Sequence, residues 1–149
     1  MQKKEIKNKI INHLMLNGDK KTSENILFKA TKNLQKNCKK QLKQVVKLSI
    51  LNSIPTFKLH QIKNKKQKKK NKKIKEIPAF IAKQTARASL SIKFILASMK
   101  KKNTKKIYKQ LNQEILLTVE SKGNAIELKN KLQQQVILKK HFFKYYRWK

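Results

Sequence analysis

The sequence predicts a mainly α-helical fold, with six helices in one domain and a basic two-stranded β-ribbon between the third and fourth helices. Three observations lead to this prediction. Apolar residues recur with helical spacing in most of the chain, and two short runs alternate like strands. At 149 residues and 38% apolar composition, the chain supports one modest core. We therefore expect a single domain over residues 1–149, with a helical body at 5–53 and 82–148 and a ribbon at 54–81.

Three helices are predicted before the ribbon. The first covers residues 5–17, because its apolar residues share one helical face and Gly18 is placed to cap its C-terminal end. The second begins between Asp19 and Ser23, whose short polar side chains can accept the first amide hydrogens of a helix. The third ends before Pro55, and its inward face is expected to hold Leu42, Val45, Val46, Ser49 and Ile50.

The ribbon is predicted where two alternating apolar runs flank a lysine-rich tip. Between Lys63 and Lys75, nine of thirteen residues are lysine and none is acidic, so this tip requires an anionic partner. Each flanking run carries a proline, which suits a strand end or a sheet edge. We expect residues 63–73 to be disordered in the free protein. The charge pattern alone leaves open a disordered linker in place of the ribbon.

Three more helices are predicted after the ribbon. Thr85 is placed to cap the fourth helix, and Thr104 is placed to open the fifth. Asn130 and Gln133 have the spacing of a capping box for the sixth helix. The apolar stripes predict one core that contains Ile10, Leu14, Leu27, Leu34, Val45, Ile92, Ile95, Leu111 and Val136.

The charge balance indicates a polyanionic partner, with nucleic acid first. Forty basic residues face seven acidic residues, which gives a formal net charge of +33. Only Arg87 and Arg147 are arginine, and lysine favours recognition of a phosphate backbone over reading of bases. No apolar run reaches the roughly 18 residues that span a bilayer, so no membrane partner is expected.

No catalytic, metal or cofactor site is expected. Cys38 is the only cysteine, and the three histidines are scattered, so nitrogen and sulfur ligands form no four-ligand metal set. Glu114, Glu120 and Glu127 lack an accompanying nucleophile or base, and we expect them to form surface ion pairs with lysines. An enzyme is therefore not predicted. A basic architectural DNA-binding protein remains the alternative class.

Four stretches share their order and spacing with one known family. They are residues 11–26 (INHLMLNGDKKTSENI), Ile77-Pro78 followed by Arg87 and Ile92-Lys93-Phe94, residues 111–125 with LNQEI and KGNA, and residues 143–148 (FKYYRW). Together they resemble the small-subunit ribosomal protein seven family of bacterial, organellar and cytosolic ribosomes. The resemblance implies a structural protein of the subunit head that binds the 3′ major domain of ribosomal RNA. Its implied partners are neighbouring head proteins, exit-site tRNA and mRNA.

Residue types and the resemblance together indicate a set of RNA contacts. Lys20 and Lys21 lie at a helix start, where amides and lysines suit a phosphate, although a solvated cap is the alternative. Phe143 is expected to pack on the core, whereas Arg147 is the better candidate for RNA. The complete set of predicted RNA-binding residues is Lys20, Lys21, Lys63, Lys65, Lys66, Lys68, Lys69, Lys70, Lys72, Lys73, Lys83, Arg87, Lys93, Lys100, Lys101, Arg147 and Trp148.

Departures from the family pattern favour an organellar protein. The family's arginine pair in the ribbon reads about Ile62-Lys63 here, a glycine-free segment follows, and the second arginine before the fourth helix reads Ala86. The bias toward lysine, isoleucine and asparagine is typical of an AT-rich genome. Because the first residues lack the character of an import presequence, we expect an organelle-encoded protein of the mitochondrial matrix, with a plastid as the alternative.

Overall fold

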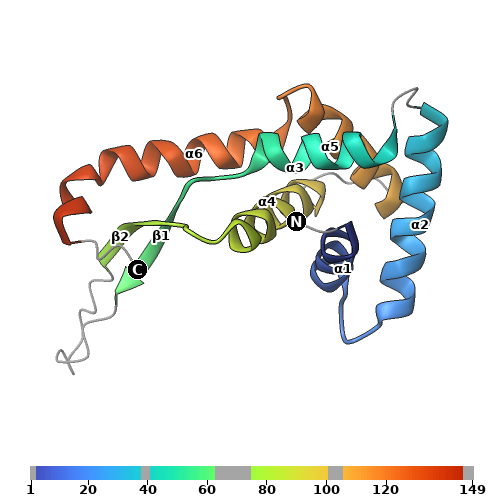
Figure 1. Cartoon of the computed structure of the whole chain (residues 1–149), viewed down its shortest axis with the longest axis horizontal. Helices are drawn as coiled ribbons and strands as arrows, with labels where there is room; N and C mark the ends of the chain where they lie inside the picture. The colour runs from blue at the N-terminus through green and yellow to red at the C-terminus, as the bar shows by residue number, and fades with distance from the viewer. Residues whose placement is uncertain (1–2, 38–40, 63–74, 101–105, 146–149) are drawn as a thin grey trace.

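The computed structural model describes residues 3–37, 41–62, 75–100 and 106–145. Its elements are α1 (Lys3–Leu14), α2 (Lys20–Asn37), α3 (Leu42–Ser53), β1 (Phe57–Ile62), β2 (Lys75–Phe80), α4 (Gln84–Lys100), α5 (Ile107–Val119), α6 (Asn124–Leu138) and the 3₁₀ helix η1 (Lys140–Tyr145). Figure 1 shows α2 at one end of the long axis and the β1–β2 hairpin at the other. The predicted fold class is confirmed, with six α-helices and an antiparallel hairpin between α3 and α4 in the described residues.

Helix α5 is central to the helical body. It packs against α2, α3, α4 and α6, and its Leu111 and Ile115 are buried in the core. The same cluster contains residues from α2, α3, α4 and α6, and the predicted Ile10, Leu14 and Leu27 pack against it half-buried. Val136 is buried as predicted, but it lies outside this cluster. The expectation that all nine predicted residues share one cluster is therefore wrong for Val136.

Small polar side chains bring α3 and α4 together. The Ser53 and Ser91 Oγ atoms lie 2.7 Å apart, and the Ser91 hydroxyl also donates to the Ile50 carbonyl at 3.1 Å. Both serines are fully buried. Because each buried hydroxyl has a hydrogen-bond partner, the two helices can approach closely without leaving polar atoms unsatisfied.

Helix α6 begins at Asn124, six residues before the predicted capping box. The reason is a cap supplied by another helix. Glu114 of α5 is fully buried, and its Oε1 accepts a hydrogen bond from the Ala125 backbone N–H at 3.0 Å. Gly123 makes the turn with a φ of 97°, a conformation that favours glycine. The prediction that Glu114 forms a surface ion pair is therefore wrong, because this side chain is buried and caps α6.

Other predicted boundaries differ in smaller ways. Helix α4 begins at Gln84, so Thr85 lies inside its first turn and does not cap it. Asp19 does cap α2, since its Oδ1 accepts a hydrogen bond from the Thr22 N–H at 3.1 Å. Thr104 and Cys38 lie outside the described residues. None of the described helices is long and apolar enough to cross a membrane.

The hairpin is paired as the alternating pattern predicts. Phe57 lies opposite Phe80 at its base, and Ile62 lies opposite Lys75 at the last described pair. Pro78 is buried within β2, opposite Leu59. Residues 63–74, which include the predicted lysine tip and its expected disorder, lie outside the described part of the chain.

Candidate nucleic-acid interface

An aromatic cluster fixes the base of the hairpin to the C-terminal part of the body. The Phe57 ring meets the Phe80 ring edge-on, with 5.8 Å between centroids, and its centroid lies 5.6 Å from that of Phe143. Phe143 of η1 is half-buried and packs on Phe57, so it packs as predicted, but against the hairpin base and not in the core cluster. Glu76 of β2 forms an ion pair with Lys139, which follows α6. This pairing lowers the pKa of Glu76, and a hydrogen bond from Gln61 lowers it further. The hairpin is thus attached to the body at its base through Phe57 and, farther along, through Glu76, which belongs to the last described pair but one.

Arg87 joins the start of α4 to the same base. Its Nε donates a hydrogen bond to the Ile81 carbonyl at 2.5 Å, and its guanidinium carbon lies 4.8 Å from the Phe80 ring centroid. The side chain is half-buried. A guanidinium carries five N–H donors, and the bond to Ile81 uses the one on Nε. Arg87 therefore has a fixed position at the root of the hairpin, with exposed Lys83 four residues earlier in the chain.

A second basic surface forms where α1 packs against α4. Lys9 Nζ donates to the Thr85 carbonyl at 3.0 Å, and His13 Nε2 lies 2.6 Å from Ser89 Oγ. Burial lowers the pKa of His13, and the nearby positive charges of Lys93 and Lys9 lower it further. Lys9 and Lys93 thus place positive charge on the α1–α4 face beside His13, and a like charge disfavours protonation of the imidazole.

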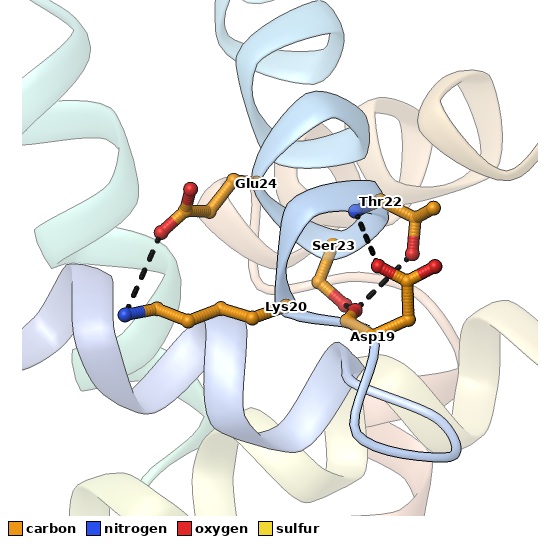
Figure 2. Close-up of polar contacts among 5 residues, drawn as sticks. All are labelled: Asp19, Lys20, Thr22, Ser23 and Glu24. Carbon is orange, nitrogen blue, oxygen red and sulfur yellow. Dashed lines mark hydrogen bonds and ion pairs between the residues drawn. The ribbon is translucent and has the colours of Figure 1, made fainter.

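The start of α2 is capped by its own residues (Figure 2). Asp19 accepts a hydrogen bond from the Thr22 backbone N–H, and its carbonyl accepts the Thr22 and Ser23 hydroxyls at 3.2 and 3.1 Å. Lys20 Nζ lies 3.9 Å from a Glu24 carboxylate oxygen, one helical turn away. The carboxylate of Asp19 thus occupies a position where a phosphate could have met the amides. Any phosphate binding by Lys20 and exposed Lys21 depends on their side chains.

The structure separates the described candidates into three places. Arg87 and Lys83 lie at the hairpin base, Lys93 lies on the α1–α4 face, and Lys20 and Lys21 lie at the start of α2. The side chains of the other candidates lie outside the described part of the chain: Lys63, Lys65, Lys66, Lys68, Lys69, Lys70, Lys72, Lys73, Lys100, Lys101, Arg147 and Trp148.

Sequence reasoning missed Lys9 and His13. Their spacing of four residues places them on one helical face, next to the apolar stripe of α1, and this was the available signal. The spacing does not show which helix faces them, because contact with Thr85 and Ser89 depends on the packing of α1 against α4. Among the described residues, no group of three or more His, Cys, Asp or Glu side chains is arranged to hold a metal ion.

Comparison with known proteins agrees with this geometry. The family described as Ribosomal protein S7p/S5e matches residues 1–137. The small ribosomal subunit protein uS7 of Blochmanniella pennsylvanica is 26% identical over 140 residues, which cover 94% of this chain and 85% of the relative. The uS7 of Wigglesworthia glossinidia brevipalpis is 28% identical over 97% of this chain and 87% of its own length. An organellar relative, uS7c of Tetradesmus obliquus, is 24% identical over 83% of this chain and 70% of its own length.

A basic helical body with a projecting hairpin, matched along most of its length, defines a ribosomal protein of the small subunit. The chain belongs to the ribosomal protein S7p/S5e family. It is accordingly a structural, RNA-binding constituent of the ribosome that serves translation, and it is not an enzyme.

Proposed function

We propose that this protein binds the 3′ major domain of small-subunit ribosomal RNA and helps to assemble the head of the subunit with neighbouring head proteins. Its hairpin would then lie beside exit-site tRNA and mRNA. The observation that carries the proposal is the fixed base of the hairpin. The Phe57 ring contacts and the Arg87–Ile81 hydrogen bond hold this base to the body, and the Glu76–Lys139 ion pair holds β2 farther along the hairpin.

Because the base of the hairpin is fixed, the lysines that follow β1 project from a defined place on the body. Nine lysines lie between Lys63 and Lys75, immediately beyond the described end of β1, and they have no acidic neighbours within that segment. A narrow arm held at its base can enter an RNA junction that is too small for the helical body. Its lysines can then reach phosphates that the surface of the body cannot reach. We propose contacts from the tip lysines, together with Lys83 and Arg87 at the base.

The α1–α4 face is a second surface that we expect to contact the ribosomal RNA. Lys9 reaches α4 through its hydrogen bond to the Thr85 carbonyl, and Lys93 lies on the same helix, so both positive charges lie near His13 on this face. Lysine side chains attract backbone phosphates electrostatically, and this attraction does not depend on which bases are present. We propose that this face binds RNA backbone and that recognition depends on RNA shape.

We also propose that the protein works in the mitochondrial matrix. The support is compositional, since lysine makes up 38 of the 40 basic residues, as expected for an AT-rich organellar genome. Relatives include the organellar uS7c as well as bacterial uS7. Detection of the protein in purified mitochondria, and its absence from plastids, would test this assignment.

The binding experiment compares three ligands of equal length: the 3′ major domain transcript, another domain of the same ribosomal RNA, and duplex DNA. We expect the full chain to prefer the first ligand at physiological salt. In a second arm, Lys83→Gln with Lys93→Gln should lower the slope of log affinity against log salt by about 1.4 to 1.8, if each lysine contacts one phosphate.

The matched control is Lys43→Gln with Lys131→Gln, which removes the same charge from exposed positions on α3 and α6. We expect it to change the salt slope much less. Equal affinity for the three ligands would contradict specific ribosomal RNA binding and would favour a general DNA-compacting protein. Equal slopes for the two double variants would remove Lys83 and Lys93 from the interface.

A further inference from the structure

A groove lies between α2 and the start of α5. Figure 1 shows α2 at the end of the molecule opposite the hairpin. The groove is lined by residues of α2, by Lys106 and by the first residues of α5. Neither the hairpin nor the α1–α4 face contributes to it. It is therefore a separate surface from those assigned to RNA above.

Lysines line this groove from both sides. Lys29, Lys32 and Lys36 follow one another on α2 at spacings of three and four residues, which places them on one helical face. Lys106 faces them from the start of α5. All four side chains are exposed, and no acidic residue is among the described residues that line the groove.

Helix α2 carries its opposite charges on different sides. Its one acidic residue, Glu24, lines a different groove, between α1, α2 and α3, and lies beside Lys20. Lys29, Lys32 and Lys36 line the α5 side instead. Because neighbouring like charges on a helix repel one another, an anion in the groove would relieve this repulsion.

The start of α5 adds to the positive potential. Lys106, the N-cap residue, makes no capping hydrogen bond with its side chain, and the first turn of α5 contains no acidic residue. Backbone amides at a helix start carry partial positive charge and favour an anion there. Asn33 of α2 also lines the groove and offers a neutral donor and acceptor, while half-buried Tyr108 packs against the core beside it.

We propose that the α2–α5 groove binds a second segment of ribosomal RNA through its phosphates, so that the protein bridges two RNA segments held at its opposite ends. Lysines spaced along a groove can follow a phosphate backbone, since each supplies a point charge that needs no fixed geometry. This inference rests on the proposed function and extends it to a surface that the ribosomal RNA contacts proposed above do not use.

The test uses two triple variants of the full chain. The groove variant combines Lys29→Gln, Lys32→Gln and Lys36→Gln, and the control combines Lys43→Gln, Lys47→Gln and Lys131→Gln at exposed positions outside the groove. Each is bound to the 3′ major domain transcript, and the RNA is footprinted with hydroxyl radicals at several salt concentrations. Thermal unfolding first checks that both variants fold like the wild type.

We expect the groove variant to lose protection over one RNA segment while it retains the segment that depends on Lys83 and Lys93. Its salt slope should fall by about 2 to 3, if each lysine contacts one phosphate. A groove variant whose footprint and slope match those of the control would overturn the inference. Failure of the wild type to bind the transcript would instead contradict the proposed function itself.

Discussion

The Glu114 carboxylate of α5 accepts a hydrogen bond from the backbone N–H of Ala125 at 3.0 Å, so one helix caps the start of another. Both residues are fully buried. An N–H at a helix start has no partner within its own helix, and burial without an acceptor would be costly. This bond therefore links the turn after α5 to the position and direction of α6, which also contacts β1 of the hairpin.

Replacing Glu114 tests the cap directly. Glu114→Ala removes the acceptor and should lower the free energy of unfolding by about 1–3 kcal/mol, the usual cost of a buried donor left without a partner. Glu114→Gln keeps a side-chain oxygen and should lose less. Chemical denaturation of the two variants measures the difference. Equal losses would show that the Ala125 N–H does not depend on this oxygen.

Gly123 tests the turn that leads into the cap. A Cβ at this position would lie 3.0 Å from Leu117 Cβ and 3.2 Å from Glu114 Oε1, and the residue has a φ of 97°. Gly18 also has a positive φ, of 80°, but a Cβ there would meet nothing within 4 Å. Alanine at either position should cost about 1–2 kcal/mol for the backbone conformation. Gly123→Ala should cost more, because crowding is added.

The matched pair separates these two causes. Denaturation midpoints of Gly123→Ala and Gly18→Ala, measured in the same buffer, give the crowding contribution by difference. If Gly18→Ala proved as destabilising as Gly123→Ala, then crowding against Leu117 and Glu114 would have no measurable role in the turn.

Ile92 tests the core. It is 2% exposed in the main cluster, and Ile92→Ala should lower the free energy of unfolding by about 2–5 kcal/mol. Ile137 of α6 is 64% exposed, so Ile137→Ala should change the free energy of unfolding by less than about 0.5 kcal/mol. Urea titrations measure both. A loss at Ile92 as small as that at Ile137 would mean that α4 is turned away from the core.

His13 predicts a pH dependence of stability. Burial, Lys93 and Lys9 lower its pKa from the ordinary value of 6.5, so the unfolded chain binds a proton more readily than the folded protein does. Stability should be fully present above about pH 6.5 and should fall as the pH drops through the lowered value. Unfolding of the wild type and His13→Gln between pH 7.5 and 5 measures this contribution.

The variant should lose less stability than the wild type over that range. Glu76 titrates in a separate, more acidic window, because its pKa is lowered from the ordinary carboxyl value of 4.5. Parallel pH profiles for the wild type and His13→Gln would contradict the placement of His13 beside Lys9 and Lys93.

Much of the fold could be predicted from local sequence. The six apolar stripes and the paired alternating runs depend on periodicity, and periodicity is a property of neighbouring residues. Helix α6 was the main failure, because the acceptor that caps Ala125 comes from Glu114, which lies eleven residues earlier on another helix. A search for a local capping box could not find it, and Asn130 and Gln133 lie well inside the helix.

The candidate interface was less predictable than the fold. Sequence pointed to Arg87 through a family resemblance, but its bond to Ile81 and its position over Phe80 depend on how the hairpin meets α4. Lys9 and His13 were missed because two helices form their surface together. The lysine tip could be found from composition alone, since charge density requires no knowledge of packing.

The tip makes a separate prediction about salt dependence. Changing Lys66, Lys68, Lys69, Lys70 and Lys72 to glutamine should weaken RNA binding and lower the salt slope by about 0.7 to 0.9 for each phosphate that the variant no longer neutralises. The weakening should be similar for different RNA sequences of the same shape, because lysine reads little base information. An unchanged slope in a folded variant would assign RNA binding to the helical body alone.

Sedimentation of the native protein tests the central claim most directly. Organelle extract is separated on a sucrose gradient with the subunits apart, and the protein is detected by antibody in every fraction. We predict that it sediments with the small ribosomal subunit and that ribonuclease, but not deoxyribonuclease, releases it to the top of the gradient. A protein that stays at the top before nuclease treatment, or that only deoxyribonuclease releases, would contradict its role as a structural constituent of that subunit.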